Sequence, residues 1–367
     1  MKISIITTTI NYPELLIEYA EDSVSVSKKH DVNFIIAGDL KTPAKTKSLC
    51  EKIQREYKVE CIYLDPKSQI KYLTKFDKLN KYLSWNSVQR RNIAFLKAIE
   101  TGSEIIITID DDNFLESKNF IENHIKAFSQ KNYTMISSNN GWYNVCELLK
   151  EKNNNTFFHR GYPVSKRKLN AKSTAKKVKD KKIAINAGLW VGDPDVDAVT
   201  RLSNNIIATK YKFNNNFILN KRTNSPFNSQ NTAINSKIAP CYFLSADVGR
   251  MDDIYASYIT KKICAHLDYF ISYGKPIVRQ NRNNHNIWRD LELETRYHES
   301  LEVFLEYLKQ IKLSKSSDTF FKATLELMNK LKLKLKKNKS KIEKEILSKF
   351  INSYIIWLET LKILKIY

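Results

Sequence analysis

Along the first 140 positions, short apolar runs alternate with longer amphipathic stretches. The short runs predict strands and the periodic stretches predict helices. Strands are expected at 2–9, 32–38, 59–64 and 104–109, and helices from about Pro13, at 43–57 and at 87–102. The last strand, "EIIITI", shows no alternation, which is typical of a strand covered on both faces.

This order of strands and helices predicts an α/β fold, with a mixed, mostly parallel, Rossmann-like sheet flanked by helices. In such sheets, ligands bind beyond the carboxyl ends of the strands. Gly38-Asp39 and Asp110-Asp111-Asp112 each follow a predicted strand. We therefore expect these two segments to lie at ligand-binding ends of the sheet.

The pattern is less regular between residues 140 and 250, which are rich in Asn, Gly, Pro and aromatic residues. We expect long loops there that face a ligand. Residues 252–272 predict a helix. Beyond about residue 290 the chain is Lys-rich and lacks Gly and Pro, which predicts helices. The expected division is a catalytic α/β domain at 1–295 and a Lys-rich helical extension at 296–367.

The chain is strongly basic, because its 367 residues carry a formal net charge of +22. Such a charge favours an anionic partner, which is a nucleic acid, an anionic membrane surface or a phosphorylated small molecule. The basic residues gather in the segment 166–182 and in the C-terminal extension. Because the chain shows no nucleic-acid-binding motif, we expect no nucleic-acid partner.

The five cysteines are scattered and form no CxxC pair. They are expected to be reduced and mostly buried, which favours a cytoplasmic protein and argues against a metal site built on cysteine. The first ten residues lack the features of a signal peptide. No apolar run approaches the roughly 18 residues of a membrane span, so no transmembrane helix is expected.

Three consecutive carboxylates follow the strand at 104–109. Like charges this close raise one another's pKa unless a cation is present. Mg²⁺ and Mn²⁺ bind carboxylate oxygens together with substrate phosphates. Because alternate residues of an extended chain point the same way, Asp110 and Asp112 can face one ligand while Asp111 faces another. This favours a metal-assisted nucleotide-sugar site; the alternative is an acidic turn that caps a helix beginning near Ser117.

Three later segments carry further candidate residues. Arg160 lies in "RGYP", and carboxylates occupy alternate positions of the stretch 193–197. Asp252 and Asp253 open the helix predicted at 252. Acids in that position either stabilise the positive end of the helix or act on an acceptor hydroxyl as a general base.

Two basic segments allow alternative interpretations. The segment 166–182 holds nine lysines or arginines, and it is either a solvated, mobile loop or a lid that closes over a diphosphate. A lid predicts that neutralising four of its lysines raises the KM for the donor: Lys176, Lys177, Lys181 and Lys182. The apolar positions of 350–367 favour packing on the catalytic domain or on a second subunit, and the alternative is a basic helix on a membrane surface.

The chain resembles the STELLO-type glycosyltransferase-like proteins. The resemblance spans about residues 1–300 and rests on "AGDLKTP" (37–43), "RRNIAFLKAIETGSEIIITIDDDN" (90–113), "RGYP" (160–163), "GLWVGDPDVDAVTRL" (188–202), "FNSQNT" (227–232), "GRMDDIYASYI" (249–259) and "RNNHNIWRDLELE" (282–294). More distantly, "TIDDDN", "RGYP" and "RMDD" are similar to the reversibly glycosylated polypeptides, which are UDP-arabinopyranose mutases.

Both resemblances imply a GT-A-type fold and nucleotide-sugar chemistry. They imply that Asp110 and Asp112 hold Mn²⁺ or Mg²⁺, with His285 as a further metal or diphosphate ligand. They imply catalytic roles for Arg160, Asp252 and Asp253. The nucleotide-sugar-binding residues expected are Thr8, Asp39, Arg90, Arg91, Asp110, Asp111, Asp193 and Asp195.

Two functions follow from these expectations. The first is a metal-dependent glycosyltransferase that uses a nucleotide-sugar donor and an unknown glycan acceptor in surface-glycan or polysaccharide synthesis. The alternative is a nucleotide-sugar mutase that interconverts pyranose and furanose rings, with the sugar transiently attached to Arg160. Because arginine stays protonated and is a poor nucleophile, a diphosphate clamp is the conservative role for that residue. A catalytically silent scaffold and assembly into a homo-oligomer are left open.

Overall fold

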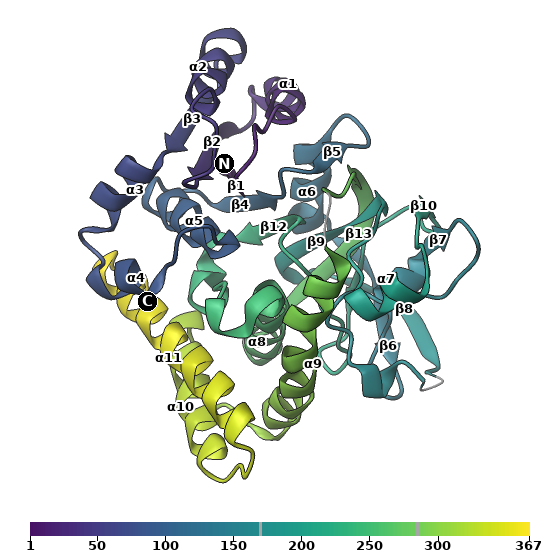
Figure 1. The fold of residues 1–367 in the computed structure, drawn as a ribbon. Coiled ribbons are helices and arrows are strands. Elements are labelled where there is room, and N and C mark those ends of the chain that lie inside the picture. Colours follow the sequence, from purple (N-terminus) through teal and green to yellow (C-terminus); the bar gives the residue numbers. More distant parts are fainter. Residues whose placement is uncertain (169–170, 284–285) are drawn as a thin grey trace.

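A computed structural model describes residues 1–168, 171–283 and 286–367 (Figure 1). Within these residues, the strands form one sheet in the order β3-β2-β1-β4-β12-β9-β13-β11-β6-β8, with β5, β7 and β10 attached beside it. The strands are β1 (Lys2–Thr9), β2 (Asp31–Gly38), β3 (Glu60–Leu64), β4 (Ile105–Ile109), β5 (Asn113–Leu115), β6 (Asn132–Ser138), β7 (Leu149–Glu151), β8 (Ser173–Lys179), β9 (Lys182–Gly192), β10 (Ala208–Tyr211), β11 (Phe217–Leu219), β12 (Asn231–Asn235) and β13 (Tyr269–Gln280).

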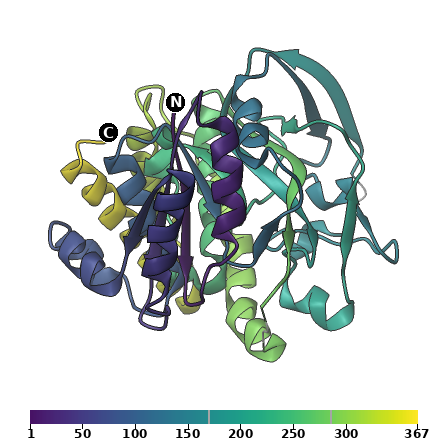
Figure 2. The ribbon, with the colours of Figure 1, turned by 90° about the horizontal axis from the view of Figure 1, so that it is seen from above.

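Helices cover the sheet on both faces (Figures 1 and 2). The α-helices are α1 (Leu16–Val26), α2 (Thr46–Tyr57), α3 (Pro66–Leu73), α4 (Asp77–Tyr82), α5 (Arg91–Glu100), α6 (Phe120–Ser129), α7 (Ala198–Ser203), α8 (Asp252–His266), α9 (Ile287–Gln310), α10 (Phe320–Lys336) and α11 (Lys341–Ile363). Short 3₁₀ turns are η1 (Val88–Arg90), η2 (Val145–Leu148), η3 (Val164–Lys166), η4 (Ser236–Cys241) and η5 (Ala246–Met251).

The N-terminal part of the sheet is parallel, since β1 lies between β2 and β4, and β2 also pairs with β3. All five residues of β4 are buried, as expected for an apolar run without alternation. Beyond β4 the sheet is mixed, because β12 runs antiparallel to both β4 and β9 while β13 runs parallel to β9. The predicted α/β class, a mixed sheet flanked by helices, is confirmed.

Two predictions for the middle of the chain are wrong. The segment 186–202 is not wholly a loop, because β9 occupies residues 182–192 and is almost entirely buried in the sheet. Its asparagine and glycines suggested a loop, but Asn186 is buried in the sheet and forms a hydrogen bond with His124 of α6. The helix expected at 252–272 ends at His266, and Asp268, with φ +62°, turns the chain into β13.

The segment 166–182 also differs from expectation. Residues 173–179 form the edge strand β8, which pairs antiparallel with β6 along its whole length. Both earlier interpretations, a mobile loop and a closing lid, are therefore wrong for this strand. Lysines on an edge strand have a plain structural use, because their charge discourages pairing with another chain.

The C-terminal helices pack on the rest of the chain (Figure 1), and their apolar side chains join its core. The indole of Trp357 is fully buried, donates a hydrogen bond to the carbonyl oxygen of Ala239 at 2.8 Å and stacks on Phe243. The prediction that 350–367 packs on the catalytic region is thereby confirmed. Residue 295, the expected domain boundary, lies inside α9, and the division into two domains stays a prediction.

The buried surface of α11 gives a first testable prediction. Replacing Trp357 with phenylalanine is expected to lower the free energy of unfolding by about 1–3 kcal/mol, because the indole hydrogen bond and part of the packed volume are lost. Urea unfolding followed by circular dichroism measures the change. Trp288, which is 69% exposed, provides the matched control, and its replacement by phenylalanine should change little. Equal effects at the two positions would contradict a packed α11.

The structure bears on two further expectations, which concern membrane-spanning helices and the cysteines. Among the described residues, every helix is too short or too polar to cross a bilayer. The five cysteines are all free and buried, as predicted.

Candidate active site

The carboxylate turn, residues 110–112, lies where the ends of β4, β5 and β13 meet. The side-chain oxygen of Asn113 accepts a hydrogen bond from the Asp110 amide at 3.2 Å. The Asn281 amide, just after β13, donates to the Asp112 carbonyl oxygen at 3.1 Å. Both ends of the turn are thereby fixed, at the carboxyl end of β4 where the sequence placed a ligand site.

The three carboxylates of this turn have different partners. Asp110 forms an ion pair with the buried guanidinium of Arg91. Asp111 turns toward the end of β1, where it accepts hydrogen bonds from Thr9 and Asn11. Asp112 is only 8% exposed, and its Oδ1 atom has no hydrogen-bond partner among the described residues. One carboxylate oxygen is therefore buried and unsatisfied, which costs free energy unless a cation or donor binds it.

The alternative of a helix-capping turn is wrong. The helix that follows, α6, has its N-terminal amides bound by Asp22 of α1, whose oxygens accept from the amides of residues 119, 120 and 121 at 2.6, 3.0 and 2.9 Å. The carboxylate turn thus has no share in these capping bonds. Its charge needs another explanation.

The electrostatics of the turn suit a cation. Burial, together with the charges of Asp110 and Asp111, raises the pKa of Asp112 to about 7. Burial also raises the pKa of Asp111. Within 1–168, 171–283 and 286–367, no group of three or more His, Cys, Asp or Glu side chains is arranged to hold a metal alone. Two carboxylates completed by substrate phosphates are a common Mg²⁺ arrangement, so Asp110 and Asp112 fit a cation of this kind.

Arg160 lies at the centre of a second, buried cluster. Its guanidinium donates to Asp195 at 2.9 Å and to both oxygens of Asp253 at 3.0 and 3.2 Å. Burial opposes the charge of Arg160, but the two carboxylates outweigh it and hold the guanidinium pKa well above its usual range. Burial likewise opposes ionisation of Asp195, yet Arg160 keeps the pKa of that carboxyl well below its ordinary value.

The two clusters are joined through Ser229. Arg91 donates to the Ser229 hydroxyl, and the Ser229 amide and hydroxyl donate to Asp253 at 3.1 and 3.3 Å. A continuous path of hydrogen bonds therefore runs from Asp110 to Arg160. On the other side, Arg282 lies 3.6 Å from Asp193 and 3.7 Å from Asp195, and its charge also acts on Asp112.

Asp252 differs from its neighbour Asp253, because among the described residues it forms no ion pair. It accepts a hydrogen bond from Gln89 at 2.8 Å and is 5% exposed. Burial and the adjacent Asp253 raise the pKa of Asp252 to about 7. A carboxyl that titrates near neutrality can both accept and return a proton. Helix capping describes only part of this pair. Asp252 also accepts a hydrogen bond from the Asp253 amide in the first turn of α8 at 2.9 Å, whereas Asp253 bonds Arg160 and Ser229 outside the helix.

Comparison with known proteins identifies the family. A family model for reversibly glycosylated polypeptides matches residues 46–365. The chain belongs to the reversibly glycosylated polypeptide family. The more distant of the two resemblances in the sequence is thereby confirmed, while the STELLO-type resemblance stays a prediction.

Curated relatives in this family are plant proteins. The chain is 27% identical over 266 residues to probable UDP-arabinopyranose mutase 4 of Arabidopsis thaliana, covering 69% of this chain and 66% of that protein. It is 29% identical over 241 residues to probable UDP-arabinopyranose mutase 1 of Pisum sativum, covering 63% and 61%. The matches therefore span slightly less than two-thirds of these relatives' lengths.

Several solved structures align with the chain at low similarity. Glucosyl-3-phosphoglycerate synthase from Mycobacterium tuberculosis, in complex with Mn²⁺, UDP and glucosyl-3-phosphoglycerate, aligns with a TM-score of 0.43 and 11% identity, covering 85% of this chain and 81% of that one. TarS 1–349 from S. aureus in complex with UDP aligns with a TM-score of 0.36 and 13% identity, covering 99% and 91%. Scores this low say nothing about activity.

Other expected site residues of this family member are engaged with protein groups. Asp39 is buried and accepts hydrogen bonds from the amides of residues 40, 86 and 87. Thr8 donates to the Ala37 carbonyl oxygen, and Arg90 stacks 3.4 Å over the ring of Trp85. A role of these three side chains in binding a nucleotide sugar stays a prediction. His285 lies outside the described residues.

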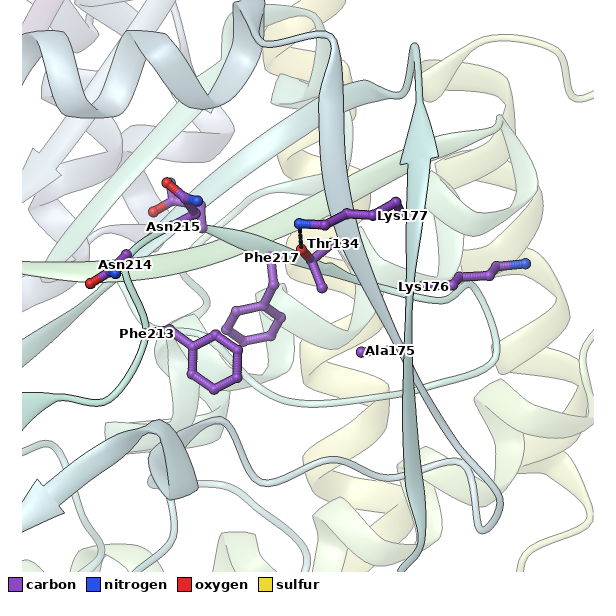
Figure 3. Close-up of a pocket in the computed structure, with 9 residues that line it drawn as sticks. Thr134, Ala175, Lys176, Lys177, Phe213, Asn214, Asn215 and Phe217 are labelled. Carbon is purple, nitrogen blue, oxygen red and sulfur yellow. Dashed lines mark hydrogen bonds between the residues drawn. The ribbon is translucent and has the colours of Figure 1, made fainter.

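The lysines of β8 lie far from the carboxylate turn of this family member. Figure 3 shows Lys176 and Lys177 beside a hollow of about 380 Å³ that Phe213 and Phe217 also line, with Lys177 bonded to Thr134. In the sheet order, β8 is six strands away from β4 and three from β13, whose end also adjoins the turn. At about 4.8 Å per strand, the smaller of these separations is about 14 Å. This distance places Lys176 and Lys177 outside the candidate site.

Replacing Lys176 and Lys177 with glutamine should therefore leave the KM for a nucleotide-sugar donor within about twofold of its original value. Salt at 0.1 M screens exposed charges beyond about 10 Å, so neutralisation at about 14 Å or more has little effect. Steady-state kinetics at varied donor concentration measure the result. A tenfold rise in KM would contradict this prediction and restore the idea of a lid.

Sequence reasoning overlooked three residues of the network in this family member, namely Ser229, Arg282 and Gln89. The first two lie in segments that were recognised as similar to known proteins, "FNSQNT" and "RNNHNIWRDLELE". Similarity marked the segments but gave no reason to choose these side chains. Gln89 precedes the paired arginines 90 and 91, and only the fold brings it to Asp252.

Proposed function

We propose that this chain is a nucleotide-sugar mutase, which interconverts the pyranose and furanose forms of a sugar that is bound to a nucleoside diphosphate. The match of residues 46–365 to the family model carries this proposal. The names of the curated relatives suggest a UDP-pentose as substrate. The carboxylate turn supports the proposal, because it offers a charged, partly buried end of the sheet for a metal and diphosphate.

In this proposal Asp110 and Asp112 hold Mn²⁺ or Mg²⁺ next to the diphosphate. When bound, the cation neutralises the diphosphate and stabilises it as a leaving group. Arg91 orients Asp110 through their ion pair, and Ser229 holds Arg91 in place. The unsatisfied Oδ1 of Asp112 supplies the second contact.

We assign proton transfer to Asp252. When a pyranose becomes a furanose, the ring oxygen becomes a hydroxyl and a former hydroxyl oxygen closes the ring, so one proton leaves one oxygen and one arrives at the other. A group that does both works best with a pKa near the working pH. The pKa of about 7 at Asp252 meets that requirement.

Arg160 is assigned a positioning role instead of a covalent one. Its guanidinium is buried and fully engaged by Asp195 and Asp253, and its raised pKa keeps it protonated. A protonated guanidinium has no free electron pair to attack an anomeric carbon. Recapture of the sugar by the diphosphate itself is the step consistent with this geometry.

One experiment tests the proposed function. The protein is incubated with UDP-arabinopyranose and Mn²⁺, without any acceptor, and the products are followed by ¹H NMR. Appearance of the furanose isomer supports a mutase. Hydrolysis alone, or no reaction, contradicts it and favours a glycosyltransferase, the second candidate, in which Asp252 would act as base on an acceptor hydroxyl. Either activity would serve polysaccharide synthesis.

The remaining partners are proposals of the same kind. We propose a cytoplasmic location with peripheral binding to an anionic membrane. The exposed lysines of α10 would contact the membrane, because the apolar side chains of α11 are buried in the core. Flotation with anionic vesicles tests it, using a variant with glutamine at 332, 336 and 337. Assembly into a homo-oligomer is tested by light scattering.

A further inference from the structure

A cavity of about 730 Å³ lies away from the carboxylate turn, between α8, α9 and the loops around residues 141 and 222. We call it the basic groove. Seven basic and two acidic residues line it. Both acids already have partners, since Glu302 accepts hydrogen bonds from Ser165 at 3.1 and 2.7 Å and Glu306 accepts from Gln310 at 2.9 Å. Glu306 also pairs with Lys309 at 3.9 Å, and Lys221 pairs with Asp268 at 2.6 Å. Since the basic residues outnumber the acids, the groove still has a positive excess.

The buried lysine of this groove, Lys261, is the key observation. Lys261 is 5% exposed, and its ammonium donates to the Asn220 carbonyl oxygen at 3.0 Å. An ammonium carries three donors, and within the described residues Lys261 forms no ion pair. Burial lowers its pKa to about 8. A buried cation without a counter-charge is unfavourable, so an anion in the groove would stabilise it.

Other basic side chains also line the basic groove. Arg222, Lys262 and Lys312 line the groove, and their charged groups have no hydrogen-bond or ion-pair partner among the described residues. Aromatic and aliphatic surface is present as well, because Trp142 and Tyr258, whose ring centroids are 6.0 Å apart, also line it. Apolar walls with a few well-placed charges are typical of sites for small organic ligands.

We propose that the basic groove binds an anionic saccharide, a sugar that carries phosphate or carboxylate groups. Lys261, Arg222 and Lys312 would contact the anionic groups, and Trp142 and Tyr258 would contact the carbon face of the sugar. This site is separate from the proposed nucleotide-sugar site, because Lys261 lies nine residues, or about 14 Å of helix, beyond Asp252 on α8. The two are nevertheless connected, since the Tyr258 hydroxyl donates to the carbonyl oxygen of Gly161, next to Arg160.

Isothermal titration calorimetry in metal-free buffer tests the groove. Fructose 1,6-bisphosphate and trigalacturonic acid represent the two sources of negative charge, and fructose and methyl-esterified trigalacturonate are the neutral controls. We expect at least one of the anionic sugars to bind, and both neutral sugars to bind at least tenfold more weakly or not at all. Lys261→Met, and the double variant Arg222→Gln with Lys312→Gln, should each weaken binding at least tenfold.

A control for net charge is the double variant Lys336→Gln with Lys337→Gln in the exposed end of α10, which should bind as the original protein does. If Lys261→Met fails to fold, the surface double variant decides. Failure of both anions to bind, equal weakening in the control, or binding of a single-stranded RNA decamer in their place would overturn the proposal. Displacement of the sugar by UDP would also overturn it. If UDP does not bind in a separate titration with Mn²⁺, the proposed mutase fails while the groove result stands.

Discussion

Replacing Arg160 with methionine is expected to lower the free energy of unfolding by about 3–5 kcal/mol, the range for breaking a buried ion pair on one side. Methionine keeps much of the side-chain volume, so the loss comes mainly from charge. Asp195 and Asp253 would be left buried, 2% and 4% exposed, without the guanidinium that neutralises them. Urea unfolding followed by circular dichroism measures the change.

A matched control and a partial rescue sharpen this prediction. Arg279 pairs with Glu116 at the surface, where both side chains are substantially exposed, so Arg279→Met should cost less than about 1 kcal/mol. Adding Asp253→Asn to Arg160→Met removes one of the stranded charges and should restore part of the lost stability. A loss at Arg160 no larger than at Arg279, or no rescue, would contradict the buried network.

The N-terminal part of the fold could be predicted because its signals are local. The runs at 32–38 and 104–109 are mostly apolar without alternation, and their shortness and β-branched residues favour a strand covered on both faces. The strand β9 lacked this signal. Asn186 and Gly188 lie within it, and their place is set by long-range contacts, with His124 and Asn231. No local pattern contains those contacts.

The candidate site likewise has one part that follows from a local sequence signal and one part that depends on long-range contacts. The carboxylate turn is a single local stretch, and its position after a buried strand was sufficient to predict it. The partners of Arg160 were not predictable, because Asp195 and Asp253 are 35 and 93 residues away along the chain. The same three residues were named as separate candidates. Their union in one cluster favours the proposed positioning role of Arg160 over the covalent and diphosphate-clamp roles considered from the sequence.

Replacing Asp112 with asparagine is expected to weaken the Mn²⁺-dependent binding of UDP by at least about 100-fold, equivalent to about 2.7 kcal/mol. The substitution removes the charge of the carboxylate whose Oδ1 atom lacks a partner in the described structure. Titration calorimetry with UDP, with and without Mn²⁺, measures it. Glu116→Gln, a nearby exposed carboxylate outside the turn, is the control and should bind UDP normally.

In metal-free buffer, Asp112→Asn is expected to raise the stability of the protein at high pH, whereas the same substitution weakens UDP binding. The pKa of Asp112 is raised to about 7, from an ordinary value of about 3.8, so folding favours its protonated form. Without metal, the stability that this group contributes is fully present below about pH 4 and is lost as the pH rises through 7, at about 1.4 kcal/mol per unit of pKa shift. Asp112→Asn, which cannot ionise, should therefore be more stable than the original protein at pH 8 in metal-free buffer.

A metal reverses that order, because the cation binds the ionised carboxylate. Mn²⁺-dependent binding of UDP by the original protein should strengthen from pH 6 to pH 8 as Asp112 ionises, whereas Asp112→Asn should lose this part of the pH dependence. A purely structural Asp112 would give the stability change without the binding change. If Asp112 attracts Mn²⁺ only through general negative charge, Glu116→Gln should weaken Mn²⁺-dependent UDP binding to the same extent. Loss of metal-dependent binding together with a gain of metal-free stability at pH 8 is the combination that a metal-binding carboxylate predicts.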